Sequence, residues 1–399
     1  MTFAHISDTH LGYRAYGRTT AEGKNQREVD VLQTFKRALD AIQERDPDVV
    51  VHAGDLFHVV RPSNYSIVHT FRLLSNFQEA RKGRPFILIG GNHDAPRMSD
   101  DGCILDLFRG IPGLQIAWRK AERFEHPDLN LDVLCVPSNS IAHGEQVEYL
   151  PSGTQPYSLL VLHGLANQAM PEKGNFDLEE AHHERWTYVA MGDYHVHRAF
   201  GRNCCYAGST DFTSTNIWEE IKPGAWHRNP TPKQDTDLVP SDYRSIKGWI
   251  WYDTELARAE FVPVQTRTVI DLDPIDAKSM DGPAIGDKLL ERAQWDAKED
   301  PVVRQTIFNV HPETRARIPQ DIVRELKAKA LHYSLDVRLL SALPASVSER
   351  TPGESLDMSW EAHASSAVLP FGMDRDRVTG LGKDLLREVQ ERETAAVEA

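Results

Sequence analysis

Residues 1–10 read Met-Thr-Phe-Ala-His-Ile-Ser-Asp-Thr-His, a short apolar run followed at once by polar side chains. The run predicts a β-strand from Phe3 to Ile6. Asp8 and His10 then follow the strand end, where they bring a carboxylate and an imidazole close together. This unit, a short apolar strand that ends in polar residues, recurs along the first half of the chain.

Short apolar runs alternate with helical patterns over roughly the first 220 residues, an order typical of an α/β fold. Apolar residues at helical spacing predict helices around residues 29–42 and 67–77. Further strands are predicted at residues 49–51, 86–89, 133–136, 159–162 and 188–191.

Five of the predicted strands are followed directly by polar segments. They are Asp8-Thr9-His10, Gly54-Asp55, Gly91-Asn92-His93-Asp94, His163-Gly164 and Gly192-Asp193-Tyr194-His195-Val196-His197. The carboxyl ends of strands in an α/β sheet line one crevice, so we expect these segments to converge. Carboxylates, imidazoles and an amide oxygen suit Mn²⁺, Fe²⁺ or Zn²⁺ better than Ca²⁺ or Mg²⁺.

The chemistry of a phosphodiester explains this mixture of residues. Two cations about 3.5–4 Å apart can neutralise the anion, generate hydroxide and hold the displacement in line. Asp55 is the carboxylate that we expect to bridge both cations. Each segment alone has an ordinary reading, such as a capped turn, a loop dipeptide or a hydrogen-bonded histidine. Five segments in this order, each at a strand end, favour a metal site.

The composition limits the class of protein. The 399 residues are enough for two or three domains. No run of about 18 apolar residues predicts a membrane span, and the start lacks the pattern of a signal peptide. Four cysteines without a CxxC pair are typical of reduced thiols, so we expect a cytoplasmic protein. The net charge of −14 argues against a uniformly basic nucleic-acid binder, although bound cations or a local basic loop would offset it.

The pattern of elements divides the chain into three parts. Residues 1–264 form the predicted catalytic domain, which contains a long polar loop at 222–243 and ends in a strand pair near 248–252 and 260–264. Residues 265–343 show the order β-α-β-α-β, which predicts a small α+β capping domain of split βαβ type.

The third part, residues 344–399, is predicted as a polar linker and an amphipathic helix near 376–396. The helix carries one apolar stripe, formed by Val378, Leu381, Leu385 and Val389. The stripe would either fold back on its own domain or dock a partner.

Three segments carry a resemblance to a known family. Ile6-Ser7-Asp8-Thr9-His10-Leu11-Gly12, His52-Ala53-Gly54-Asp55-Leu56-Phe57-His58 and Gly90-Gly91-Asn92-His93-Asp94 resemble the calcineurin-like metallophosphoesterase superfamily. More narrowly, the chain resembles the SbcD-type DNA double-strand-break repair exonucleases. That match rests on Asp-Leu-Phe-His at 55–58, the paired His195 and His197, and Tyr-Ala-Gly-Ser at 206–209. The resemblance extends to about Val264 and implies a two-metal phosphoesterase β-sandwich flanked by helices.

The resemblance implies a set of metal ligands. One metal would be held by Asp8, His10, Asp55 and His197, and the second by Asp55, Asn92, His163 and His195. The fifth motif departs from the family, because many relatives have a shorter glycine-histidine form. Asp193 is unexplained by this pattern and would be a solvent-facing carboxylate.

The resemblance also implies roles beside the metals. His93 would contact the phosphate and act as general acid for the leaving oxygen, with Asp94 able to orient its ring. His58 would sit beside the ligands or contact the substrate, and a purely structural histidine is the alternative. Basic and aromatic residues interleave after the first motif, where they could hold phosphates and stack bases or form a solvated loop. The candidate DNA contacts are Tyr13, Arg14, Arg18 and Lys24.

The function implied by the resemblance is a cytoplasmic Mn²⁺-dependent DNA nuclease. It would act as a 3′ to 5′ exonuclease on duplex ends and as an endonuclease on single strands, with a metal-bridging hydroxide as the nucleophile. The working form would be a homodimer bound to an SMC-like ATPase of the SbcC type, with no membrane association.

Two other functions fit parts of the pattern. A two-metal phosphodiesterase or phosphatase on a non-DNA substrate would use the same core motifs, although the chain beyond the catalytic domain favours a polymer substrate. A noncatalytic scaffold would keep the fold without the chemistry. The complete set of ligand types and His93 argue against the scaffold.

Overall fold

The computed structural model describes residues 1–96, 102–221, 226–227, 246–340, 360–361, 364–365 and 374–385. The chain forms two compact units, Met1–Leu339 and Leu340–Ala399. The polar loop predicted at 222–243 lies outside the described residues, apart from 226–227.

The first sheet contains the three strands that precede the first three polar motifs. Its order is β13-β12-β1-β2-β3-β4, in which β1 to β4 are parallel, β12 pairs antiparallel with β1, and β13 pairs antiparallel with β12. Its strands are β1 (Thr2–Ile6), β2 (Val49–His52), β3 (Phe86–Ile89), β4 (Leu114–Ala117), β12 (Gly248–Asp253) and β13 (Arg258–Pro263). The predicted closing strand pair is therefore confirmed as β12 and β13.

The second sheet supplies the strands before the last two motifs. Its order is β5-β6-β7-β8-β10-β9, and β6, β7, β8 and β10 run parallel to one another. Its strands are β5 (Glu122–His126), β6 (Leu131–Val136), β7 (Tyr157–His163), β8 (Tyr188–Gly192), β9 (Arg198–Ala199) and β10 (Cys204–Tyr206). The two sheets pack around a shared core that includes Phe3, Val51, Ile89, Val133 and Val161, all fully buried.

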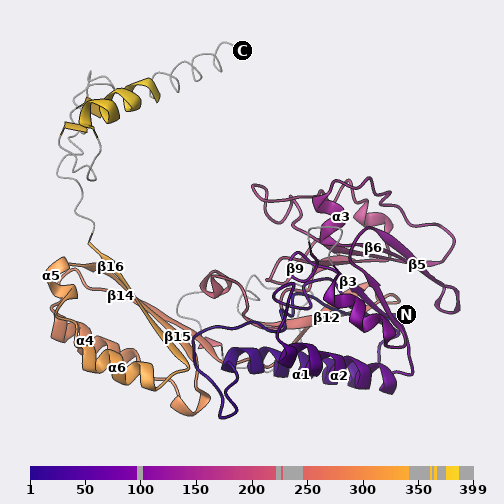
Figure 1. Ribbon diagram of the computed structural model, residues 1–399, viewed down its shortest axis with the longest axis horizontal. Coiled ribbons are helices and arrows are strands. Elements are labelled where there is room, and N and C mark those ends of the chain that lie inside the picture. Colours follow the sequence, from indigo (N-terminus) through magenta and orange to yellow (C-terminus); the bar gives the residue numbers. More distant parts are fainter. Residues whose placement is uncertain are drawn as a thin grey trace. The chain divides into compact units, whose positions relative to one another are not determined.

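Two long helices cover the other face of the first sheet (Figure 1). Helix α1 (Gln26–Arg45) begins after Asn25, whose side chain accepts the backbone N–H bonds of Arg27 and Glu28. An N-cap hydrogen bond of this kind stabilises the folded chain by about 1 kcal/mol. Helix α2 (Asn64–Ala80) is capped by Ser63 in the same way. Their apolar stripes bury Val31, Phe35, Ile42, Leu74 and Phe77 against the sheet. The predicted α/β sandwich with flanking helices is confirmed.

Short helical segments complete the connections between the strands of the sandwich. They are η1 (Ile104–Gly110), η2 (Pro127–Leu129), α3 (Ser138–Ala142), η3 (His183–Arg185) and η4 (Ile217–Glu220).

A smaller four-stranded sheet follows, which we call the cap. Its order is β11-β14-β15-β16, with β14, β15 and β16 parallel and β11 antiparallel at the edge. Its elements are β11 (Trp226–His227), β14 (Val269–Asp276), α4 (Gly282–Arg292), η6 (Ala297–Glu299), β15 (Val302–Val310), α5 (Pro312–Arg315), α6 (Gln320–Ala328) and β16 (His332–Leu339).

The order of elements in the cap agrees with the prediction, but its strand pairing does not. Each helical connection joins strands that are direct parallel neighbours, whereas a split βαβ unit leaves room for another strand between them. Helices α4 and α6 lie together on one side of the sheet and bury Ile285, Leu289 and Leu326 in a core of their own.

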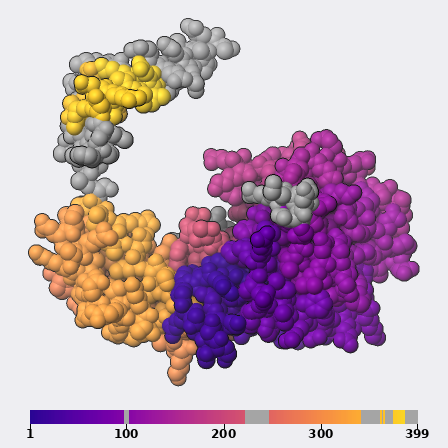
Figure 2. All heavy atoms as spheres, viewed as in Figure 1, coloured from indigo at the N-terminus to yellow at the C-terminus, as the bar shows by residue number. Residues whose placement is uncertain are grey.

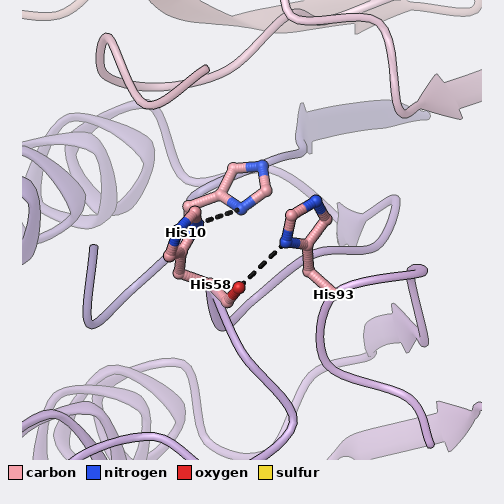
Figure 3. A group of neighbouring side chains, drawn as sticks. All are labelled: His10, His58 and His93. Atoms are coloured by element: carbon pink, nitrogen blue, oxygen red, sulfur yellow. Dashed lines mark hydrogen bonds between the residues drawn. The ribbon is translucent and has the colours of Figure 1, made fainter. Parts of the chain in front are cut away.

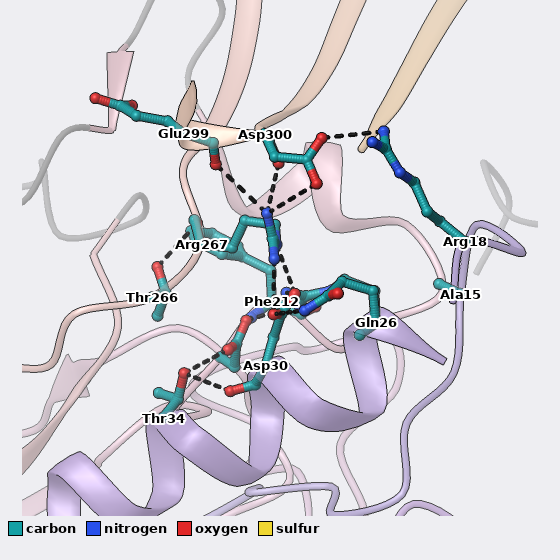
Figure 4. Close-up of polar contacts among 12 residues, drawn as sticks. Ala15, Arg18, Gln26, Asp30, Thr34, Phe212, Thr266, Arg267, Glu299 and Asp300 are labelled. Atoms are coloured by element: carbon teal, nitrogen blue, oxygen red, sulfur yellow. Dashed lines mark hydrogen bonds and ion pairs between the residues drawn. The ribbon is translucent and has the colours of Figure 1, made fainter. Parts of the chain in front are cut away.

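The cap contacts the N-terminal part of the chain through a polar joint. Figure 2 shows the N-terminal residues, in indigo, against the orange atoms of the cap. Arg267 donates two hydrogen bonds to Asp30 of α1, at 2.5 and 2.8 Å, and a third to the carbonyl of Asp300 at 2.6 Å (Figure 4). Arg18 pairs with the Asp300 carboxylate at 3.1 Å, and Tyr16 stacks on His332. We call these contacts the cap joint.

The unit Leu340–Ala399 is described at residues 340, 360–361, 364–365 and 374–385, with a helix at 375–385. Leu381 and Leu385 of the predicted stripe are 63% and 55% exposed, so within the described residues they are not packed into a core. Val389 lies outside the described residues. In the described part of the chain, no helix is long and apolar enough to cross a membrane.

Candidate metal centre

The five polar motifs meet where the carboxyl ends of the two sheets come together. The first three motifs follow β1, β2 and β3 of the first sheet, and the last two follow β7 and β8 of the second. Backbone bonds join the first two loops, with Asp8 N donating to Gly54 O and His10 N donating to Asp55 O, each at 3.0 Å. The motifs therefore converge as predicted, although two sheets contribute rather than one.

Three of the polar residues hold a backbone conformation that side chains rarely adopt. Asp8, His10 and Asp55 have φ values of 50°, 46° and 55°, in the left-handed region. Such residues cost about 1–3 kcal/mol each and cluster at functional sites. In this backbone conformation the three side chains point toward the same buried region.

Gly91 is required by the close approach of two loops. A Cβ atom at Gly91 would lie 2.0 Å from the carboxylate Oδ1 of Asp55. No side chain fits there, so the glycine lets the third motif reach Asp55.

The first group of converging side chains contains Asp8, His10 and His195. The Nε2 atoms of His10 and His195 lie 2.9 Å apart, and His10 Nε2 lies 3.6 Å from Asp55 Oδ2. Asp8 and His10 are buried, and the side chain of His195 is 17% exposed. Two imidazole nitrogens aimed at one point beside two carboxylates form a donor set for a divalent metal.

The second group contains Asp8, Asp55 and His163, all fully or almost fully buried. His163 Nε2 lies 3.5 Å from Asp55 Oδ2 and 3.0 Å from the side-chain oxygen Oδ1 of Asn92. It also lies 3.9 Å from Asp193 Oδ1. Asp8 belongs to both groups. Asp55 Oδ2 lies between them, 3.6 Å from His10 Nε2 of the first group and 3.5 Å from His163 Nε2 of the second, which is the arrangement expected of a bridging carboxylate.

The ring orientations fit metal ligation. His163 Nδ1 lies 2.7 Å from the carbonyl of Ala53, which can only accept a hydrogen bond. The proton of the neutral ring therefore sits on Nδ1, and Nε2 keeps its lone pair for a metal. His195 Nδ1 faces the carboxylate of Glu220 at 3.5 Å, with the same consequence for its Nε2.

The buried charges of the cluster shift one another's pKa values. Burial by itself disfavours the protonated ring of His163, but Asp55 and Asp193 outweigh it and raise the pKa well above its usual range. Burial also opposes ionisation of Asp55, yet His163 and His10 hold the pKa of that carboxyl below its usual range. The carboxylates of this cluster need compensating positive charge, which divalent cations supply.

The structure places the residues of the fifth motif differently from the prediction. His195 joins Asp8 and His10, where His197 was expected. His197 Nδ1–H instead donates to the carbonyl oxygen of Tyr206 at 2.7 Å, and the ring stacks on Phe261. None of the three ligand groups found among the described residues includes His197.

Asp193 was expected to face solvent, but its side chain is only 22% exposed, and burial raises its pKa to about 6. Its backbone N–H donates to the carboxylate of Asp8 at 3.0 Å, and its side chain approaches His163. The Gly-Asp-Tyr-His spacing at 192–195 is the signal that could have identified it, because Asp193 directly follows the end of β8.

His93 and His58 lie together beside the first group (Figure 3). The carbonyl of His58 holds His93 Nδ1 at 2.9 Å, and the rings of the two histidines stack 5.3 Å apart. His58 Nδ1 also lies 3.3 Å from His10 Nδ1. The predicted place of His58 beside the ligands agrees with these contacts.

Asp94 has a different role from the predicted one. Its carboxylate accepts backbone N–H bonds from Gly91, Leu56 and Phe57. It therefore ties the second motif to the third, while the His58 carbonyl orients the ring of His93.

Each of the four predicted DNA contacts has a side-chain partner in the structure. Arg14 pairs with Glu28 at 2.9 Å, and Arg18 belongs to the cap joint. Tyr13 packs edge-on against His58, and Lys24 lies over the ring of Tyr65. Tyr13 is thus the one of the four that the structure brings beside the histidines of the site.

Comparison with known proteins agrees with this geometry. A family described as calcineurin-like phosphoesterase matches residues 1–216. A DNA double-strand break repair protein Mre11 of Methanococcus maripaludis is 30% identical over 233 residues, which cover 56% of this chain and 60% of the relative. The Mre11 protein of Sulfurisphaera tokodaii is 31% identical over 223 residues, 52% of this chain and 53% of the relative. That of Halobacterium salinarum is 42% identical over 108 residues, 27% of this chain and 25% of the relative. The matched region therefore spans little more than half, or less, of each of these relatives.

Proposed function

This chain belongs to the calcineurin-like phosphoesterase family, and from that membership we propose that it is a two-metal DNA nuclease of double-strand-break repair. The observation that carries the proposal is the position of the Asp55 carboxylate, whose Oδ2 lies 3.6 Å from His10 Nε2 and 3.5 Å from His163 Nε2, one histidine from each ligand group. Relatives that are named for double-strand-break repair support DNA as the substrate.

The proposed ligand set follows the contacts of the described residues. Asp8, His10, Asp55 and His195 would hold the first metal, and Asp55, Asn92, His163 and Asp193 the second. This set replaces His197 with Asp193 and moves His195 from the second metal to the first. The mixture of nitrogen and oxygen donors suits Mn²⁺, which we propose as the working metal.

The bound metals would neutralise the phosphodiester and lower the pKa of water so that it can act as nucleophile near neutral pH. The contribution of the chain itself is to place His93 at the same site. Because the His58 carbonyl accepts the proton of His93 Nδ1, Nε2 is the ring atom available to the substrate. We assign His93 the transfer of a proton to the leaving oxygen. Tyr13 and Lys24 would contact the DNA backbone or bases near the site.

The assembly proposed from the resemblance is a cytoplasmic homodimer that works with an SMC-like ATPase of the SbcC type. The exposed Leu381 and Leu385 support a docking role for the helix at 375–385. Exonuclease action from 3′ to 5′ on duplex ends and endonuclease action on single strands are parts of the same proposal. A two-metal phosphodiesterase on a smaller substrate is the rival, because its chemistry would use the same ligands.

The test is Mn²⁺-dependent digestion of an end-labelled linear duplex by the wild-type chain and by His93→Ala. We expect release of labelled nucleotides by the wild type and a loss of about 100-fold or more in the variant. Metal content, measured by elemental analysis, should be equal in the two proteins. Hydrolysis of a small diester without digestion of DNA, with the ATPase present or absent, would favour the phosphodiesterase instead.

A further inference from the structure

A buried ion pair lies against the metal centre and has no part in the proposed ligand set. It joins Glu220, the last residue of η4, to Lys247, which directly precedes β12. The two side chains are only 6% and 1% exposed. Burying two charges carries a large desolvation cost, so such a pair needs further contacts to offset it.

Lys247 uses its ammonium group to fasten the fifth motif. Its Nζ donates to the backbone carbonyl of His195 and to the hydroxyl Oγ of Ser209, each at 2.8 Å, and pairs with Glu220 Oε2. The same ammonium lies 4.9 Å from the centre of the Phe212 ring. Lys247 thus ties the backbone of His195 to Ser209 and Glu220.

The other oxygen of Glu220 faces the ring of His195. Glu220 Oε1 lies 3.5 Å from His195 Nδ1, within ion-pair distance, and neither buried atom has a hydrogen-bond partner among the described residues. On the opposite side of the ring, His195 Nε2 lies 2.9 Å from His10 Nε2. A carboxylate on one ring nitrogen and a ligand position on the other form the arrangement that orients metal-binding histidines.

We propose that Glu220 and Lys247 are positioning residues of the metal centre. Glu220 accepts the Nδ1–H of His195 and so reserves Nε2 for the first metal, while Lys247 holds both Glu220 and the backbone of His195. This inference rests on the proposed role of His195 as a ligand. Glu220 and Lys247 are 27 residues apart in the sequence, and both contact His195.

The test is isothermal titration calorimetry, in which Mn²⁺ is added to the metal-free wild type and to the metal-free Glu220→Ala variant. The wild type should bind two ions. The variant should bind one of them about 10- to 100-fold more weakly and the other unchanged. Glu220→Gln/Lys247→Met removes both buried charges but keeps a side-chain acceptor, and should recover most of the lost affinity. Asp271→Asn, which breaks the buried Arg304–Asp271 pair in the cap, is the matched control and should leave both ions unaffected.

A spectroscopic readout separates positioning from a general loss of stability. In the Zn²⁺-loaded chain labelled with ¹⁵N-histidine, His195 should carry its proton on Nδ1, and this signal should change in Glu220→Ala. Two unchanged affinities in the folded variant would overturn the positioning role and leave the metal centre intact. Equal weakening of both ions, together with a lower melting temperature, would also overturn it, because the pair would then only stabilise the fold. A wild-type chain that binds no metal would overturn both this inference and the proposed function.

Discussion

Asp193 Oδ1 lies 3.9 Å from His163 Nε2; His163 is the last residue of β7, and Asp193 directly follows the neighbouring parallel strand β8. The relationship gives the second proposed metal a carboxylate ligand in the motif where the sequence alone suggested two histidines. Substitution of Asp193 is therefore expected to remove a metal, whereas substitution of His197 is expected to leave both metals bound.

Substitution of Asp193 should remove the second metal. We expect Asp193→Ala to lose one of two Mn²⁺ ions after dialysis and to lower nuclease activity by at least about 100-fold, because the remaining ion cannot clamp both oxygens of the displacement. Asp193→His supplies another ligand-type side chain and should retain part of the binding. Elemental analysis of the dialysed proteins measures the metal content.

His197→Phe is the matched control for that prediction. It keeps a ring against Phe261 but leaves the carbonyl of Tyr206 without its donor, so stability should fall by about 1–3 kcal/mol while both metals stay bound. Loss of a metal from His197→Phe, with both ions kept by Asp193→Ala, would restore the assignment suggested by the sequence.

A methyl group at Gly91 should disable the site. Its Cβ would stand 2.0 Å from Asp55 Oδ1, so Gly91→Ala must displace the carboxylate shared by both metals. We expect binding of both ions to weaken together, as measured by calorimetry. Gly110→Ala is the control, since a Cβ there meets no atom within 4 Å. Normal metal binding by Gly91→Ala would contradict the shared position of Asp55.

Because of the cap joint, the free energy of unfolding should decrease as the pH falls into the acidic range. Burial opposes ionisation of Asp30, but its hydrogen bonds from Arg267 and the charge of Arg27 hold its pKa below the usual value. A lowered pKa in the folded chain means that this stabilisation is complete above about pH 4 and is lost as the pH falls through the lower pKa.

Asp30→Asn should cost about 3 kcal/mol near pH 7, because Arg267 loses its buried partner. Its stability should also respond less to acid than that of the wild type. Urea unfolding at several pH values measures both effects. The exposed Lys36–Asp40 pair offers the comparison, since Asp40→Asn should cost less than about 1 kcal/mol. Equal costs for the two variants would show that the joint contributes nothing specific.

The fold could be predicted where short apolar runs and helical spacing are strong. The strands before all five motifs, both long helices and the closing strand pair follow from local pattern. The strands β4 and β5 were missed, because Gln115 interrupts the apolar run of β4 and β5 is largely polar. The parallel pairing in the cap depends on contacts between distant segments, which element order alone does not specify.

The site was predictable by residue type but not in its detail. Strand ends indicate which motifs converge, yet beyond Gly192 the backbone turns, and Asp193 has a φ of 94°. The regular alternation of a strand therefore no longer determines which of Asp193, His195 and His197 faces the metals. Glu220 and Lys247 lie outside every recognisable motif, and only the folded chain brings them to His195.

The central claim is a pair of metals bridged by Asp55, and anomalous diffraction from a Mn²⁺-loaded crystal tests it most directly. We predict two anomalous peaks with Asp55 between them, one also contacted by Asp8, His10 and His195, the other by Asn92, His163 and Asp193. A single peak, or two peaks of which one is held by His197 in place of His195 or Asp193, would contradict the account.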